Sequence, residues 1–187
     1  PAMTEKIRGL TVFCGSSAPE PFRASAIEVG RFLGERGVRL VYGGGSIGLM
    51  GLVAEACMQA GGHVTGVIPQ FLVDREIAMG EVTELITTET MHGRKAIMAD
   101  RADAFLVLPG GLGTLDEMFE IWTWSQLRLH AKPIGVLNVH GFFDRLLEHV
   151  DVACEAGFIH RGSMPQLHVA PTISEIWASW SDRGDVR

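Results

Sequence analysis

The sequence predicts a doubly wound, Rossmann-like α/β fold, in which helices cover both faces of a parallel sheet. Short apolar runs rich in β-branched residues alternate with amphipathic stretches along the chain, and no hairpin signal joins two runs directly. Strands that alternate with helices pair in parallel through right-handed crossovers. The run at residues 104–108 is apolar throughout, which is typical of a strand buried on both sides of a sheet.

Seven strands are expected, and four of them end at a glycine turn or a proline. They cover residues 10–14, 38–42, 63–68, 82–87, 104–108, 133–139 and 167–169. The first ends at Gly15, the second at Gly43, the third at Pro69 and the fifth at Pro109. Ligands of such sheets bind beyond the carboxyl ends of the strands, which is where these glycine turns fall.

Helices are expected between and after the strands. The first runs to about residue 36, and the second stops at Gly61-Gly62 after placing Met50, Val53, Ala54 and Cys57 on one face. Further helices are expected at about residues 91–101, from the glycine turn at 110–113 to about 129, at 142–155, and ending near 180.

Length and composition fit one globular unit. With 187 residues, the chain is expected to form a single Rossmann-like nucleotide-binding domain over residues 3–187. Apolar residues make up 47% and charged residues 20% of the chain, a balance that excludes intrinsic disorder. The net charge of −6 argues against a nucleic-acid partner, which would favour a basic surface.

The cysteine, histidine and hydropathy patterns bear on cellular location, membrane association and metal binding. The three cysteines Cys14, Cys57 and Cys154 lack C-x-x-C spacing, so reduced thiols and a cytoplasmic location are expected. No apolar run reaches the roughly 18 residues that would span a bilayer, so no membrane association is expected. The seven histidines are never three to five residues apart, so no metal site is expected.

The first glycine loop follows the second strand and opens a helix. Residues 43–48 fit G-x-G-x-x-G, in which Gly43, Gly44, Gly45 and Gly48 let an anion approach bare N–H groups at a helix N-terminus. The alternative is a tight strand-to-helix turn that needs positive φ. A dinucleotide site would add an acidic residue about 20 positions later, and residues 67–70 hold none. A phosphate is therefore better supported than NAD.

The second glycine loop follows the fifth strand at residues 109–113. Thr114 and Glu117 fit a capping box, which is the structural explanation for both, but a cap alone would not need three glycines directly upstream. We expect Glu117 in the first helical turn, where the helix dipole keeps a carboxylate ionised. An ionised carboxylate beside a phosphate loop suits a base or the stabilisation of a cationic transition state.

A third motif, residues 91–95, begins the preceding helix. By themselves Arg94 and Lys95 are more typical of a solvated helix face than of a site, although lysine is rare in this chain.

Taken together, the motifs closely resemble those of the Lonely Guy (LOG) family, the cytokinin riboside 5′-monophosphate phosphoribohydrolases once labelled lysine decarboxylases. The matching strings are Y-G-G-G through G-L-M-G at 42–51, M-H-x-R-K at 91–95 and P-G-G-x-G-T-x-x-E at 109–117. The resemblance extends from the first strand to about residue 158. One departure is Gly93, where relatives often carry Glu.

The resemblance implies hydrolysis of the N-glycosidic bond of an adenine-type nucleoside 5′-monophosphate, with N6-modified bases included, and no cofactor. Arg94 and Glu117 would be the catalytic pair. The implied nucleotide-binding residues are Glu76, Arg94, Lys95, Gly111, Leu112, Gly113, Thr114, Leu115, Asp116, Glu117 and Thr123. A homodimer or a larger assembly such as a hexamer, with the site near the subunit interface, is also implied. Candidates for that surface are Trp122, Trp124, Leu127 and Leu129, with core packing as the alternative.

The chemistry is consistent with these residues, since a carboxylate such as Glu117 can stabilise an oxocarbenium-like ribose and orient water. Three alternatives remain. A nucleotide or molybdenum-cofactor carrier would keep the glycine loops without needing Arg94 and Glu117. An NAD(P)-dependent oxidoreductase lacks the acidic residue, and a DNA-handling protein of this fold is disfavoured by charge.

Overall fold

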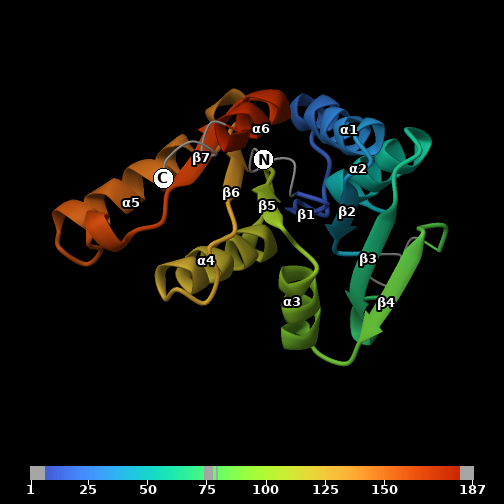
Figure 1. Ribbon diagram of the computed structural model, residues 1–187, viewed down its shortest axis with the longest axis horizontal. Helices are drawn as coiled ribbons and strands as arrows, with labels where there is room; N and C mark the ends of the chain where they lie inside the picture. The colour runs from blue at the N-terminus through green and yellow to red at the C-terminus, as the bar shows by residue number, and fades with distance from the viewer. Residues whose placement is uncertain (1–6, 74–77, 79, 182–187) are drawn as a thin grey trace.

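The computed structural model describes residues 7–73, 78 and 80–181, and its core is one parallel sheet of seven strands (Figure 1). The strand order is β4-β3-β2-β1-β5-β6-β7, and every adjacent pair is parallel, which confirms the predicted fold class. The strands are β1 (Gly9–Phe13), β2 (Arg39–Tyr42), β3 (Val64–Pro69), β4 (Glu84–Thr88), β5 (Ala104–Val107), β6 (Ile134–Leu137) and β7 (Leu167–Ala170).

Within the described residues, six α-helices connect or follow these strands, each close to its expected position. They are α1 (Glu20–Glu35), α2 (Gly48–Gln59), α3 (Met91–Asp100), α4 (Leu112–Gln126), α5 (Asp144–Glu155) and α6 (Ile173–Ser181). The expected stop of α2 is confirmed, because Gly61 adopts a φ of +79° and the Gly62 N–H donates to the Cys57 carbonyl at 2.8 Å. Short 3-10 turns occur at Gln70–Leu72, Val139–Gly141 and Arg161–Ser163.

The sheet is covered on both faces by separate apolar layers. One layer joins it to α1, α2 and α6, and its largest buried side chains are Trp180 and Tyr42. The other joins it to α3, α4 and α5 around Phe105 and Phe143. In Figure 1, α1, α2 and α6 lie along the upper side of the view and α3 and α4 along the lower side. Consecutive residues of β5 enter opposite layers, which explains its uninterrupted apolar sequence.

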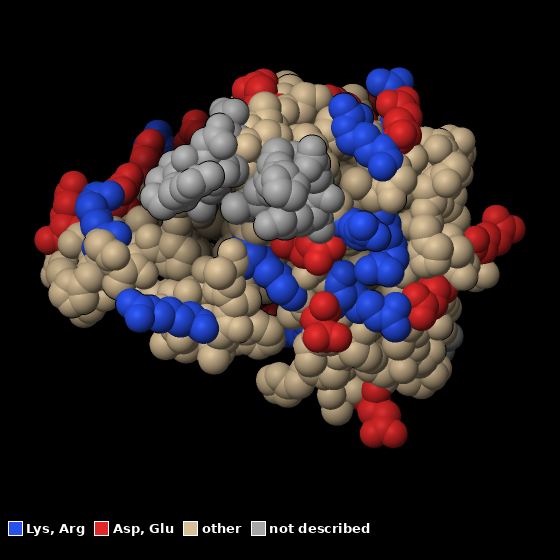
Figure 2. Space-filling view, viewed as in Figure 1, with Lys and Arg blue, Asp and Glu red and all other residues tan. Residues whose placement is uncertain are grey.

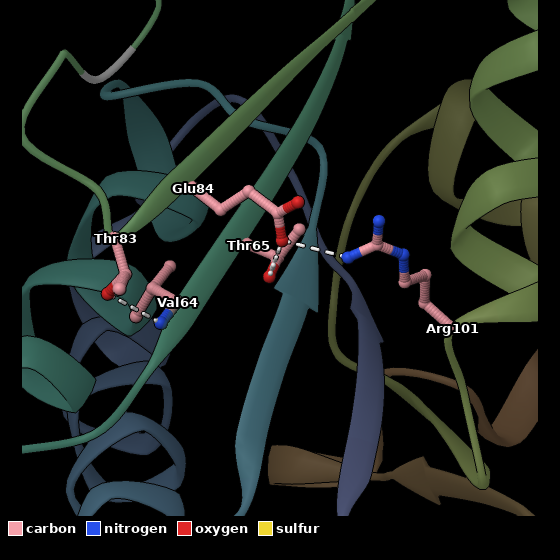
Figure 3. Close-up of polar contacts among 5 residues, drawn as sticks. All are labelled: Val64, Thr65, Thr83, Glu84 and Arg101. Atoms are coloured by element: carbon pink, nitrogen blue, oxygen red, sulfur yellow. Dashed lines mark hydrogen bonds and ion pairs between the residues drawn. The ribbon is translucent and has the colours of Figure 1, made fainter.

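The edge strand β4 is joined to α3 by a polar network (Figure 3). Glu84 accepts a hydrogen bond from the Thr65 hydroxyl at 3.1 Å and pairs with Arg101, which follows α3, at 2.8 Å. The Arg101 hydrogen bond is the main reason that the pKa of Glu84 is lowered. Figure 2 shows charged side chains of both signs interspersed on one face of the molecule. The network fixes the end of α3 that lies away from the candidate site.

Candidate active site

A cleft of about 220 Å³ opens beyond the carboxyl ends of β1, β2 and β5. Here the connection after β1 and the connection after β5 run in opposite directions along the sheet. It is walled by the turn after β1, the first glycine of the loop after β2, and the starts of α3 and α4. Its polar side chains are Ser16, Arg94, Thr114, Asp116 and Glu117, and its apolar ones include Met50, Leu72, Met91 and Met98. Motifs distant in the sequence therefore meet in one cleft.

Arg94 enters this cleft from the first turn of α3. The helix begins at Thr90, whose hydroxyl accepts the Gly93 N–H at 3.0 Å. The Arg94 side chain is 4% exposed, and it donates from Nε to the Val67 carbonyl at 2.9 Å and from Nη2 to the Gly43 carbonyl at 2.6 Å. The solvated-face interpretation of Arg94 is therefore wrong: its cation is buried and directed at the ends of β2 and β3.

Glu117 lines the same cleft from the second turn of α4. The helix begins at Leu112 with Gly111 as its N-cap and without a side-chain cap, so the predicted capping box does not form. Thr114 lies inside the first turn, where it is buried beneath Gly110. The expectation of Glu117 in the first turn is wrong by one turn, because the extended backbone of Gly111 starts the helix earlier.

The start of α4 supplies groups suited to an anion. The amides of Leu112, Gly113 and Thr114 have no carbonyl partner within the helix, as at every helix N-terminus, and all three residues line the cleft. Gly111 and Gly113 leave open space where a Cβ would lie, so an incoming group can approach the backbone. This end of the cleft favours a phosphate-sized anion close to Glu117.

Lys95 faces α4 instead of lining the cleft. Its Nζ lies 2.7 Å from Asp116 Oδ2 and 2.7 Å from Glu120 Oε2, and the side chain is 13% exposed. Burial alone would lower the pKa of this ammonium, but the hydrogen bonds to Asp116 and Glu120 outweigh it and the pKa is raised. The solvated-face interpretation is therefore wrong for Lys95 as well.

In the loop after β2, one glycine lies at the cleft and two others shape the turn. Only Gly43 lines the cleft, and Gly44, Gly45 and Gly48 do not. Gly44 and Gly48 have φ values of +77° and +64°, and a Cβ on Gly48 would overlap the backbone of Ser16. The tight-turn alternative thus accounts for Gly44 and Gly48.

Comparison with known proteins places this chain in a family. The family model described as "Possible lysine decarboxylase" matches residues 50–180. The chain is 48% identical over 173 residues to the cytokinin riboside 5′-monophosphate phosphoribohydrolase LOG of Oryza sativa subsp. japonica, covering 91% of this chain and 72% of that protein. The Lonely Guy family includes this chain. The phosphoribohydrolase LOG1 of Arabidopsis thaliana is also 48% identical, over 91% of this chain and 81% of its own length.

Solved structures show that the LOG-family fold is shared more widely. The molybdenum cofactor carrier protein of Chlamydomonas reinhardtii is 22% identical, with a TM-score of 0.67, covering 91% of this chain and 94% of that chain. DNA processing protein A of Streptococcus pneumoniae is 13% identical, with a TM-score of 0.59, over 94% of this chain and 62% of that chain. At these identities the likeness concerns the fold alone.

Other residues implied by the LOG-family resemblance lie outside the cleft lining. Leu115 packs against the layer beneath α4, and Thr123 is exposed further along that helix. Glu76 lies outside the described residues. Trp122 is a core residue, because it is 7% exposed and its indole N–H donates to the Pro165 carbonyl at 2.9 Å.

Sequence reasoning missed the cleft residues contributed by the turn after β1. Cys14, Gly15 and Ser16 line the cleft, and the Gly15 N–H donates to the Pro109 carbonyl at 3.1 Å. The available signal was the Gly15-Ser16-Ser17 turn at a strand's carboxyl end. Among the described residues, no group of three or more His, Cys, Asp or Glu side chains is arranged to hold a metal ion, and no helix is both long and apolar enough to cross a membrane.

Proposed function

We propose that this protein hydrolyses the N-glycosidic bond of adenine-type nucleoside 5′-monophosphates, N6-modified ones included, and releases the free base and ribose 5-phosphate. The observation that carries the proposal is the meeting of Arg94, Glu117 and the amide-rich start of α4 in one cleft. Relatives 46–50% identical to this chain carry the name of that activity. A carrier of the same fold needs no such pair of charged side chains.

The spacing along α4 suits a ribose 5-phosphate. Gly113 and Glu117 are four residues apart, which is about one helical turn or roughly 6 Å of rise. A 5′-phosphate bound by the amides of Gly111, Leu112, Gly113 and Thr114 therefore brings the ribose ring beside the Glu117 carboxylate. Glycoside hydrolases likewise place a carboxylate beside the sugar ring, where it stabilises an oxocarbenium-like transition state.

Bond cleavage then follows from the charges in the cleft. As the bond from C1′ to the base nitrogen breaks, its electron pair moves onto the base and positive charge builds on the ribose. Glu117 stabilises that positive charge, orients the water that attacks C1′ and accepts the proton that this water loses. The proton then passes to the departing base. The buried Arg94 cation, held by the Val67 and Gly43 carbonyls, stabilises the charge on the departing base. Asp116 also lines the cleft and adds a second carboxylate beside Glu117.

Hydrolysis can be tested directly by omitting inorganic phosphate. Turnover of AMP in phosphate-free buffer is expected to release free base and ribose 5-phosphate in equal amounts, which mass spectrometry detects. Ribose 1,5-bisphosphate formed only when inorganic phosphate is present would instead indicate phosphorolysis. Nucleotide binding by calorimetry with neither product formed would favour the carrier.

We also propose a homodimer and a cytoplasmic location. Leu127 and Leu129, at and just beyond the end of α4, are 64% and 68% exposed, so they leave apolar surface available to a second copy. Replacing both with Asp is expected to convert a dimer into a monomer in sedimentation velocity, and an unchanged sedimentation coefficient would contradict that surface. The proposed cytoplasmic location is supported by the three cysteines, none of which is in a disulfide. A single domain over residues 3–187 stays a prediction.

A further inference from the structure

Three charged side chains connect α3 to α4 beside the cleft. Lys95 reaches from α3 to Asp116 Oδ2 and Glu120 Oε2 on α4, at 2.7 Å in each case. Both contacts are ion pairs, so the attraction between their opposite charges contributes to each of them. Lys95 is 13% and Glu120 22% exposed, and neither lines the cleft. The low exposure of Lys95 and Glu120 reduces the solvent screening of their ion pair, whereas Asp116 is 59% exposed.

The members of this group are sequence neighbours of the proposed catalytic pair. Lys95 follows Arg94 on α3, and Asp116 precedes Glu117 on α4. Successive residues of an α-helix point about 100° apart, so one residue can face the other helix while its neighbour faces the cleft. Lys95 thus joins the two segments of backbone that carry Arg94 and Glu117.

The opposite end of α3 is held by hydrogen bonds from segments other than α4. The Thr11 hydroxyl donates to the Met98 carbonyl at 2.7 Å, and the Lys132 ammonium donates to the Ala99 carbonyl at 2.8 Å. These contacts attach the C-terminal half of α3 to the sheet and to the segment before β6. The N-terminal turn, which carries Arg94, is the part that Lys95 attaches to α4.

We propose that Lys95 is a positioning residue, whose ammonium, held between Asp116 and Glu120, fixes the start of α3 against α4 and so sets the placement of Arg94 relative to Glu117. This role rests on the proposed function of that pair. It differs from direct contact with substrate, which the family resemblance implies for Lys95. Without Lys95, the carboxylates of Asp116, Glu117 and Glu120 would repel one another along little more than one turn of α4.

The test combines Lys95→Met with Glu120→Gln, because Glu120 lies outside the cleft and touches substrate in neither interpretation. We expect Lys95→Met to lower kcat for AMP about 10- to 100-fold while KM changes less than about threefold, since small misplacements of catalytic groups act mainly on turnover. Glu120→Gln should lower kcat by a smaller factor, and the double variant should be no slower than Lys95→Met alone. Lys95→Arg, which can still pair with both carboxylates, should recover most of the lost kcat.

Lys132→Met is the matched control, because Lys132 also attaches α3 but at the end remote from the cleft. It is expected to lower the thermal denaturation midpoint and to leave kcat within about twofold of the wild-type value, since a substitution remote from the cleft acts on stability. If Lys95→Met does not fold, Lys95→Arg and Glu120→Gln carry the same comparison of kcat with KM.

Direct substrate contact would give a different pattern. A KM raised tenfold or more by Lys95→Met, with kcat retained and Glu120→Gln like wild type, would overturn the positioning role. Wild-type values of both constants in Lys95→Met would overturn it as well. Failure of the proposed function is recognised separately, because the wild-type protein would then release no base from AMP.

Discussion

Adding one methyl group at Gly43 should displace Arg94 without altering the backbone. The φ of Gly43 is not positive, so alanine is compatible with its conformation. Its Cβ would overlap the Nη2 atom of Arg94 and lie 3.0 Å from Met50 Sδ. The guanidinium would have to move, which breaks its hydrogen bond to the Gly43 carbonyl. Gly43→Ala therefore tests the placement of Arg94 while every charged group of the cleft remains.

The magnitude follows from these contacts. Overpacking a buried site costs about 1–3 kcal/mol, and a lost hydrogen bond to a charged group about 1.5–3 kcal/mol. Because the surrounding side chains can relax, the two costs do not add in full, and we expect the free energy of unfolding to fall by about 2–4 kcal/mol. This loss is smaller than the roughly 5–15 kcal/mol that keeps a domain folded. The midpoint should fall by about 5–15 °C. A displaced Arg94 should lower kcat/KM about 100-fold.

Base release followed by chromatography, with thermal denaturation in parallel, measures both effects. Gly162→Ala is the matched control, since a Cβ there meets nothing within 4 Å. It should leave both kcat/KM and the midpoint unchanged. A folded Gly43→Ala protein with wild-type kcat/KM would refute the reasoning, because the position of Arg94 would then not matter for turnover.

Two further predictions concern titratable groups. Burial, helped by the charge of Lys132, lowers the pKa of His130 below 6.5. As the pH falls from 6.5 to this lowered pKa, the unfolded chain takes up the proton and the folded protein does not, so stability should decrease over that range. His130→Gln should flatten this part of the pH profile of the denaturation midpoint, whereas Gln at the exposed His149 should not. Burial raises the pKa of Cys57 to about 11. After thiol labelling at pH 8, peptide mapping should therefore find the half-buried Cys154 modified and Cys57 protected until the protein unfolds. Equal labelling rates of the two thiols would contradict this.

The fold was predictable because its signals are local. Apolar runs, glycine stops and helical periodicity lie within single elements, and the structure places all seven strands and six helices close to the expected residues. The sheet's two-sided burial was readable from β5, whose successive side chains enter opposite layers.

The site was only partly predictable because its geometry depends on distant segments. Nothing near Arg94 in the sequence indicates that its guanidinium is buried, since its acceptors belong to Gly43 and Val67. Lys95 resembles a surface lysine until α4 is seen to supply two carboxylates. Ser16 enters the cleft only because β1 pairs with β5, a neighbour some 90 residues away.

The start of α4 shows how a local motif can mislead. Thr114 and Glu117 have capping-box spacing, yet the helix begins earlier, at Gly111, because that residue adopts the extended backbone of an N-cap. Thr114 is then buried within the first turn, and Glu117 is carried to the second turn, where it lines the cleft. The capping alternative for Glu117 is therefore wrong, and its place in the cleft is the one that the glycine-rich sequence upstream favoured.

The central claim is tested most directly by incubating the purified protein with AMP and, separately, N6-isopentenyl-AMP, without added metal, and separating the products by chromatography. We expect equal amounts of free base and ribose 5-phosphate from the wild-type protein, and release reduced at least about 1,000-fold in Glu117→Gln, whose side chain keeps its shape and loses its charge. The ratio of the two rates assigns the preferred base. No release from either nucleotide, or undiminished release by a folded Glu117→Gln protein, would contradict the account.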